Sequence, residues 1–377
     1  MKILKPVYTG LKKPIKALKV NLKQKAGWLG TPKILPYRGF GNNSEIFLQG
    51  MVIEDKGLAK PDDRHRVWHN VLAMIKRFSS DEIPGVRVKA GFYGLSQVTE
   101  TDENGFFNFH FDITEIPDEI LKKHWHPFSL VLMDEITEDQ PEITATGQVR
   151  IVSKEEKRII VSDIDDTVLI SHSTQTFRKL KLMLLKNALT RLPFKGVTAF
   201  YKALERGENK TSFNPFFYVS SSEWNLYDLL ENFFDHNSLP NGVFMLRKLE
   251  HSILKFWKSG QGNHEHKYEK IKFLLELYAS QNFILIGDSG QKDPEIYNRL
   301  AHSYPGRIET IYIRRIGSER FFKDIKPVIT ALEEFKTSYL QVEDTKDAAE
   351  HAIKQGYINK DLYHKYSIEK DPSFVKV

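Results

Sequence analysis

The chain has 377 residues, 41% of them hydrophobic, which is too long for one ordinary domain and apolar enough to form sizeable cores. It contains no cysteine, which excludes disulfides, thiolate metal sites and cysteine nucleophiles. The formal net charge of +6 is modest for this length, and no apolar run approaches the length of a membrane span.

Residues 1–43 are predicted to form a basic N-terminal arm, since no acidic residue precedes Glu45. Four apolar residues fall at helical spacing along one face: Leu11, Ile15, Leu18 and Leu22. Prolines and lysines interrupt the apolar residues, so we expect no secretory signal. The lysine-rich residues 1–26 can lie on an anionic membrane surface, or the apolar stripe can dock on the next domain, and both alternatives stay open. Nucleic acid is the weakest alternative, because the arm lacks the aromatic interleaving of single-strand binders.

Residues 44–152 are predicted to form an antiparallel β-sandwich domain with a helical insertion from Arg64 to Phe78. The Asn104-Gly105 pair predicts a hairpin that joins strands at 97–101 and 106–111. The other strands are expected at 46–53, 86–93, 128–133 and 143–150. No cluster in this domain looks catalytic, and we interpret it as a packing or targeting module.

Residues 153–335 alternate between strands and helices, which predicts an α/β domain with a wound parallel sheet. Strands are expected in the apolar run that opens residues 157–170 and at 216–219, 243–246, 282–288 and 307–313. Helices are expected at 177–189, from Gly196, after an N-cap at Ser222, at 266–277, and from an N-cap at Asp293. Residues 336–377 are predicted to be a C-terminal extension of helices and loops.

The chemistry gathers where the predicted parallel strands end. The first strand is followed by three carboxylates within four residues and by a threonine: Asp163, Asp165, Asp166 and Thr167. Taken alone, this segment could be a polar turn, but carboxylates crowded at a strand tip also suit Mg²⁺, which prefers oxygen ligands. Other strand ends carry Ser220-Ser221-Ser222 and Asp288-Ser289, with Asp293 and Lys267 in the neighbouring helices. Because ligands bind at the carboxyl ends of wound sheets, these groups predict one site for phosphoryl transfer.

These segments resemble the motif set of the haloacid dehalogenase superfamily of phosphotransferases. Four segments carry the resemblance, in motif order: Asp163–Thr167, Ser220, Lys267 and Gly287–Asp293. A narrower resemblance, over residues 218–227 and 283–297, is to the actin-patch-protein type of Mg²⁺-dependent phosphatidate phosphatase. Pro36–Gly41 resembles the segment that leads into the β-domain of bacterial relatives of that type.

The resemblance implies a role for each matching residue. Asp163 would attack phosphorus and form an aspartyl phosphate, and Asp165 would act as general acid and base. Ser220 would hydrogen-bond the phosphoryl group, which Lys267 would neutralise. Mg²⁺ is expected to be held by four residues: Asp163, Asp165, Asp288 and Asp293. Residues expected around the substrate are Thr167, Ser221, His172 and Arg178, with Thr167 shaping the loop.

The expected function is therefore a Mg²⁺-dependent phosphatase that converts phosphatidate to diacylglycerol, cytoplasmic or peripheral at the membrane surface. One alternative is a phosphatase for a soluble or nucleic-acid phosphomonoester. Another is a lipid-binding module without catalysis, against which the retention of both Asp163 and Asp165 argues.

Overall fold

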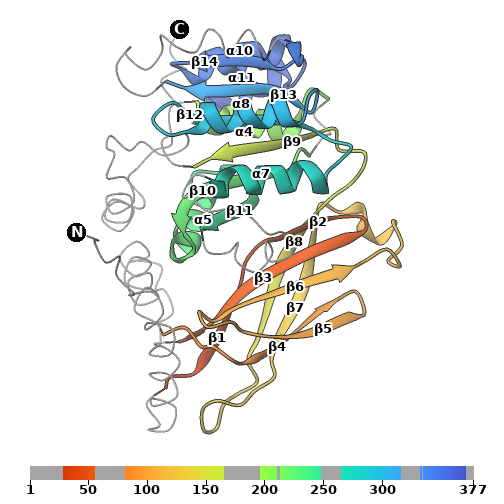
Figure 1. Cartoon of the computed structure of the whole chain (residues 1–377), viewed down its shortest axis with the longest axis vertical. Coiled ribbons are helices and arrows are strands. Elements are labelled where there is room, and N and C mark those ends of the chain that lie inside the picture. The colour runs from red at the N-terminus through yellow and green to blue at the C-terminus, as the bar shows by residue number, and fades with distance from the viewer. Residues whose placement is uncertain are drawn as a thin grey trace, which may run out of the picture. The chain divides into compact units, whose positions relative to one another are not determined.

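The chain folds into two compact units, Met1–Ile151 and Val152–Val377 (Figure 1). The computed structural model describes residues 29–55, 81–164, 196–209, 213–247, 265–315, 332 and 334–370. The N-terminal apolar stripe, the insertion predicted from Arg64 to Phe78 and the helix predicted at 177–189 lie outside these residues. Among the described helices, none combines the length and the apolar character that crossing a bilayer requires.

The first unit is an eight-stranded antiparallel sheet, as the sequence predicts for this part of the chain. Its strands are β1 (Pro32–Pro36), β2 (Gly39–Asn42), β3 (Glu45–Glu54), β4 (Arg87–Phe92), β5 (Leu95–Glu100), β6 (Phe106–Asp112), β7 (Trp125–Leu132) and β8 (Thr144–Val152). The sheet includes residues before 44, because β1 and β2 both pair with β3. The β5 strand contacts β6, so the sheet curls around a shared core.

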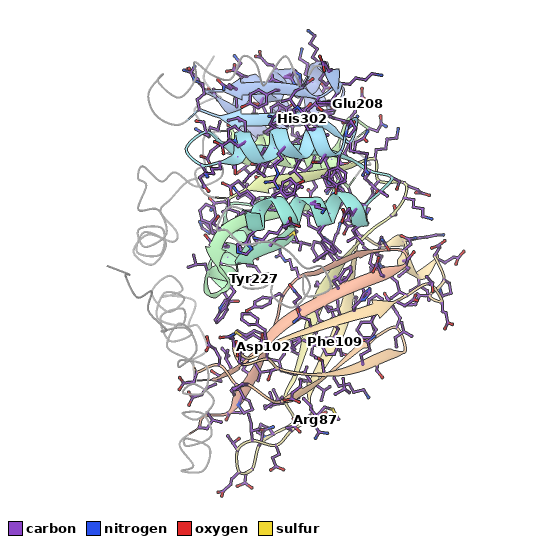
Figure 2. The ribbon with its side chains drawn as sticks, in the orientation of Figure 1. Arg87, Asp102, Phe109, Glu208, Tyr227 and His302 are labelled. Carbon is purple, nitrogen blue, oxygen red and sulfur yellow. The ribbon has the colours of Figure 1, made fainter. Side chains whose placement is uncertain are left out.

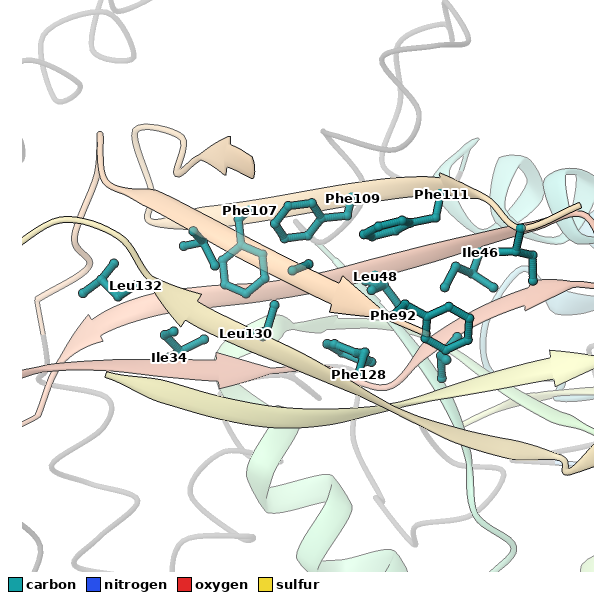
Figure 3. Packing of buried hydrophobic residues seen from close by; sticks show 14 of the residues in the cluster. Ile34, Ile46, Leu48, Phe92, Phe107, Phe109, Phe111, Phe128, Leu130 and Leu132 are labelled. Carbon is teal, nitrogen blue, oxygen red and sulfur yellow. The ribbon is translucent and has the colours of Figure 1, made fainter. Parts of the chain in front are cut away.

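Alternating side chains build that core. In β6 the aromatic residues Phe107, Phe109 and Phe111 are buried, whereas His110 between them is exposed. This is the period-two pattern of a strand with one face in the core. The three rings lie over Leu48 and other buried residues of the neighbouring strands (Figure 3).

The predicted turn at Asn104-Gly105 forms, but the predicted hairpin pairing is wrong. Asp102, labelled in Figure 2, accepts the backbone N–H groups of Asn104 and Phe106 through its side chain, at 2.8 and 3.1 Å. Gly105 has a φ of 75°, which favours glycine. The flanking strands then take other partners, since β5 pairs with β4 and β6 pairs with β3. The turn was predictable because it depends on local residues, whereas the choice of partner strand depends on packing in the core.

The second unit contains a six-stranded parallel sheet in the order β11-β10-β9-β12-β13-β14, which confirms the predicted wound sheet. The strands are β9 (Arg158–Asp163), β10 (Phe216–Glu223), β11 (Gly242–Arg247), β12 (Asn282–Asp288), β13 (Ile308–Arg314) and β14 (Ser338–Val342). The order reverses between β9 and β12, so their carboxyl ends flank the position where such sheets bind ligands. The β14 strand lies where the sequence predicts helices and loops.

Helices cover both faces of this sheet. They are α4 (Val197–Arg206), α5 (Tyr227–His236), α7 (Glu265–Leu277), α8 (Asp293–Ser303), α10 (Thr345–Lys354) and α11 (Lys360–Lys370). Adjacent residues of β9 show the two faces, because Ser162 meets Tyr201 of α4 and Asp163 meets Lys267 of α7. The α7 and α8 helices pack together, as do α4, α10 and α11 (Figure 1).

Two predicted helix caps are wrong, because Ser222 lies in a strand and Asp293 belongs to the acidic site. Ser222 lies inside β10, which continues to Glu223, and α5 begins only after a short 3₁₀ turn. Asp293 is the first residue of α8, but its carboxylate accepts a backbone N–H from Asp288 rather than from its own helix. In both cases tertiary contacts outweigh the local capping preference.

Candidate active site

The strand order brings distant site residues together at one edge of the parallel sheet. Asp163 ends β9 and Asp288 ends β12, and these strands are neighbours. Ser220 lies on β10, one residue beyond Val219, which pairs with Asp163 on the other side of β9. The predicted convergence of these three strand ends is present.

Lys267 is the cation at the centre of this group. Its Nζ lies 3.0 Å from Asp163 Oδ1 and also pairs with an oxygen of Asp293. All three side chains are buried. Burial alone would lower the pKa of Lys267, but the charges of Asp163 and Asp293 outweigh this effect and raise it, so the amine stays charged.

Asp288 completes the centre from a tight loop. Its Oδ1 accepts the backbone N–H groups of Gly290 and Gln291, at 2.7 and 3.0 Å. Its Oδ2 is buried and has no hydrogen-bond partner in the part of the chain that the structure describes. Burial, and next the charge of Asp293, raise the pKa of Asp288 to about 7. The loop thus satisfies Oδ1 of Asp288 by hydrogen bonds. Oδ2 has no such partner among the described residues, and a bound cation would compensate its charge.

The residues present fit a divalent cation. Asp163, Asp288 and Asp293 can each offer an oxygen, and these atoms lie within 4.8 Å of one another. Three buried carboxylates beside one lysine leave an excess of negative charge, which is costly in a buried site. An all-oxygen donor set with excess negative charge suits a hard ion such as Mg²⁺.

The backbone under Asp163 is also fixed. The hydroxyl of Ser162 donates to the carbonyl of Asp163 at 2.7 Å. The Ser162 hydroxyl has a single hydrogen, which this bond uses. The Tyr201 hydroxyl, whose oxygen lies 2.7 Å from Ser162 Oγ, therefore donates to Ser162. Burial raises the pKa of Tyr201, which keeps this hydroxyl protonated. The α4 helix therefore helps to hold the end of β9.

Ser220 is buried, and its side chain is oriented by the backbone. Its Oγ accepts the N–H of Ser222 at 2.9 Å. Ser221, also predicted to lie near the substrate, is exposed between two buried serines.

Four predicted site residues cannot be placed. Asp165, Thr167, His172 and Arg178 lie in residues 165–195, outside the described part of the chain. Their roles stay predictions from the sequence.

The structure adds two residues that sequence reasoning missed. Gln291 directs its amide at Asp163 Oδ2, with 3.5 Å between the two atoms. Lys270 is buried one turn after Lys267 on α7. The spacing of Lys270 from Lys267 places both on one helix face, and this was the available signal. For Gln291, the available signal in the sequence was its position between Asp288 and Asp293.

Gly287 allows α8 to approach the sheet. A Cβ at this position would lie 2.8 Å from both Asp293 Cβ and the Tyr297 ring, and would also collide with an Asp293 oxygen. We therefore expect Gly287→Ala to push Asp293 away from Lys267 and to lower the free energy of unfolding by roughly 1–3 kcal/mol, as in other overpacked cores. Urea unfolding measures this effect. A variant as stable as the unmodified chain would contradict the close packing of α8 on β12.

The fold and the centre define an α/β domain with a buried acidic site at the switch point of a parallel sheet. Residues 158–315 match the family described as "Phosphatidate phosphatase APP1, catalytic domain", which confirms the narrower resemblance, to a phosphatidate phosphatase, inferred from the motifs. The matched segment contains all six predicted site residues that the structure places: Asp163, Ser220, Ser221, Lys267, Asp288 and Asp293. The match supports the expectation of a phosphoric monoester hydrolase.

Two curated relatives show how far the similarity extends. The phosphatidate phosphatase APP1 of Saccharomyces cerevisiae is 30% identical over 155 residues, 41% of this chain and 25% of its own length. An uncharacterized protein of Schizosaccharomyces pombe is 26% identical over 267 residues, 70% of this chain and 42% of its own. The chain thus spans less than half the length of either relative.

Solved structures give only a distant likeness. An immunoglobulin-like domain of the M. primoryensis ice-binding adhesin covers 33% of this chain and 97% of its own, with 12% identity and a TM-score of 0.19. A carbohydrate acetylesterase from Xanthomonas citri covers 80% of this chain with 9% identity and a TM-score of 0.25. Scores this low carry no argument about fold or function.

Proposed function

We propose that this chain is a Mg²⁺-dependent phosphatase of the haloacid dehalogenase type, which hydrolyses a phosphomonoester through an aspartyl phosphate on Asp163. The observation that carries the proposal is the buried group of Asp163, Lys267, Asp288 and Asp293 inside the segment that matches a phosphatase catalytic domain. Carboxylates, a buried ammonium and a hydroxyl are the parts that phosphoryl transfer needs, because its catalysis is mainly positioning and charge neutralisation.

The proposed reaction has two displacements. In the first, an oxygen of Asp163 attacks phosphorus, the bond from phosphorus to the ester oxygen breaks, and the leaving alkoxide takes a proton from Asp165. In the second, water gives a proton to Asp165 and attacks phosphorus, and the bond from phosphorus to Asp163 breaks. Splitting one displacement into two lowers each barrier. The role of Asp165 rests on the sequence resemblance alone.

The placed residues have distinct tasks in this proposal. Lys267 holds Asp163 in place and neutralises the phosphoryl group, and Ser220 donates its hydroxyl hydrogen to a phosphoryl oxygen. Asp163, Asp288 and Asp293 would hold Mg²⁺, and the resemblance adds Asp165 to this set. When bound, Mg²⁺ supplies neutralisation of the negative charge on the phosphoryl oxygens.

Phosphatidate is the substrate we propose, on the strength of the family match and of the relative named for this activity. The test is phosphate release from phosphatidate in detergent micelles with Mg²⁺, compared with glycerol 3-phosphate and a 5′-phosphorylated oligonucleotide. We expect the lipid to be preferred and EDTA to stop the release. Preference for a soluble ester would overturn the assignment of phosphatidate as the substrate. Absence of phosphate release from all three compounds would overturn the proposal that the chain is a phosphatase.

Peripheral contact with an anionic membrane through residues 1–26 is part of the same proposal. Its support is the run of lysines in this segment, because basic residues near an anionic surface contribute about 1 kcal/mol each. Flotation with vesicles that contain phosphatidylserine, with and without residues 1–26, tests it. Equal flotation of both chains would assign the arm to intramolecular packing instead.

The substitution Asp288→Asn separates the effect of the Asp288 charge on stability from its proposed role in binding Mg²⁺. A raised pKa in the folded state means that the contribution to stability is present below the ordinary value of 3.8 and is lost as the pH rises through about 7. At pH 8 without metal, we therefore expect the asparagine variant to be more stable than the unmodified chain, by on the order of 2 kcal/mol. Its amide oxygen can still accept the loop N–H groups.

Excess Mg²⁺ should reverse this ranking, because only the unmodified chain gains binding free energy. Thermal unfolding at pH 5 and pH 8, with Mg²⁺ or with EDTA, measures both effects. An asparagine variant less stable than the unmodified chain in EDTA at pH 8 would contradict the inference that the buried charge of Asp288 destabilises the folded chain without metal.

A further inference from the structure

Lys270 sits where the ladder between β10 and β11 is broken. The last regular pair is Val219 with Met245, and the next pair is Glu223 with Arg247. Three residues of β10, Ser220 to Ser222, therefore stand against a single residue of β11. Irregularities of this kind bend a strand and change the direction of its side chains, often beside active sites.

The amine of Lys270 closes this break. Its Nζ donates to the carbonyl of Ser220 at 3.0 Å and to the carbonyl of Met245 at 2.8 Å. One carbonyl belongs to the first residue of the irregular segment and the other to the last regular partner on β11. Lys270 is only 2% exposed and its bond to Ser220 is buried, so this bond forms away from water, where hydrogen bonds are stronger.

Lys267 and Lys270 therefore use one face of α7 for two tasks. Lys267 pairs with the carboxylates of Asp163 and Asp293, whereas Lys270 holds the backbone that carries Ser220. The hydroxyl of Ser220 is fixed in turn by the N–H of Ser222, at 2.9 Å. The position of this hydroxyl thus depends on the irregular segment keeping its shape.

We infer that Lys270 is a positioning residue that sets the Ser220 hydroxyl for the phosphoryl group by bridging the broken ladder between β10 and β11. The inference rests on the proposed phosphatase function. It assigns Lys270 no contact with substrate, so its effect passes through Ser220.

A double-mutant cycle tests this dependence, with Lys270→Met, Ser220→Ala and the double variant assayed for phosphate release. We expect each single change to lower kcat/KM by about tenfold or more, and the double change to be within about threefold of Ser220→Ala alone. Lys272→Met is the matched control, since Lys272 is on the same helix, is partly exposed and lies 4.0 Å from Glu276 one turn further along that helix. It should stay within about twofold of the unmodified chain.

Binding of tungstate, a tetrahedral oxyanion, gives a readout that does not need turnover. Calorimetry with Mg²⁺ present should show weaker tungstate binding in Lys270→Met and Ser220→Ala, with no further loss in the double variant. Should Lys270→Met fail to fold, Lys270→Gln, whose amide can donate to one carbonyl, carries the same cycle.

Independent losses that multiply in the double variant would overturn the inference, as would unchanged tungstate binding and activity in the Lys270 variants. Failure of the proposed function looks different. In that case the unmodified chain releases no phosphate from any ester, while the tungstate cycle still reports whether Lys270 acts through Ser220.

Discussion

Asp163→Asn is expected to abolish phosphate release from phosphatidate, lowering kcat by on the order of a thousandfold or more, as the loss of a nucleophile does in other enzymes that form covalent intermediates. The substitution keeps the shape of the side chain and removes the attacking oxygen. Lys267 retains its pairing with Asp293, so the fold should persist. Phosphate release and thermal unfolding are measured on the same preparations.

The matched control is Asp347→Asn, which changes an exposed aspartate in the first turn of α10. It should leave the activity within about twofold of the unmodified chain, as surface changes usually do. Acid quenching during turnover should also trap labelled phosphate on the unmodified chain and none on Asp163→Asn. Full activity in that variant would remove Asp163 from the reaction and end the proposed mechanism.

Lys267→Met is expected to produce the largest loss of stability. Methionine fills a similar volume without charge, and it leaves Asp163, Asp288 and Asp293 together in a buried site. Removing one partner of a buried ion pair costs about 3–5 kcal/mol, because the remaining charges are uncompensated. Urea unfolding in EDTA at pH 8 measures this difference, with Lys272→Met as the control that should change little.

The loss should shrink as the pH falls. The charge of Lys267 lowers the pKa of Asp288 against burial and against Asp293, so its removal must raise that pKa further. Carboxyl groups whose pKa is raised in the folded state stabilise the protein at low pH and lose that contribution as the pH rises. The difference between Lys267→Met and the unmodified chain should therefore be smaller at pH 5 than at pH 8. A difference that does not vary with pH would mean that the carboxylates are not the cause.

The parts of the fold that depend on short runs of apolar residues were predictable from the sequence. Ile159–Val161 and Phe283–Ile286 are continuous apolar segments, and both form strands at the centre of the parallel sheet. The aspartates that end these strands were recognised because carboxylates are unusual after such runs. Because a parallel sheet brings the carboxyl ends of its strands to one edge, the meeting of Asp163 with Asp288 was predictable as well, although the strand order that makes β9 and β12 neighbours was not.

The missed features depend on contacts that no local pattern encodes. Ser338–Val342 forms β14, but its residues are only partly buried and give no apolar run. Ser222 and Asp293 have the chemistry of helix caps, but Ser222 lies within β10 and the Asp293 carboxylate accepts the backbone N–H of Asp288. The role of Lys270 arises from an irregular strand pair, and that of Gln291 from a loop folded around Asp288.

The ion pair between Lys267 and Asp163 joins residues 104 positions apart, and the pair between Lys267 and Asp293 spans another 26. No single supersecondary unit can therefore assemble these charges while the chain is being made. A chain in which these long-range contacts have not formed therefore lacks the acidic centre on which the proposed phosphatase activity depends.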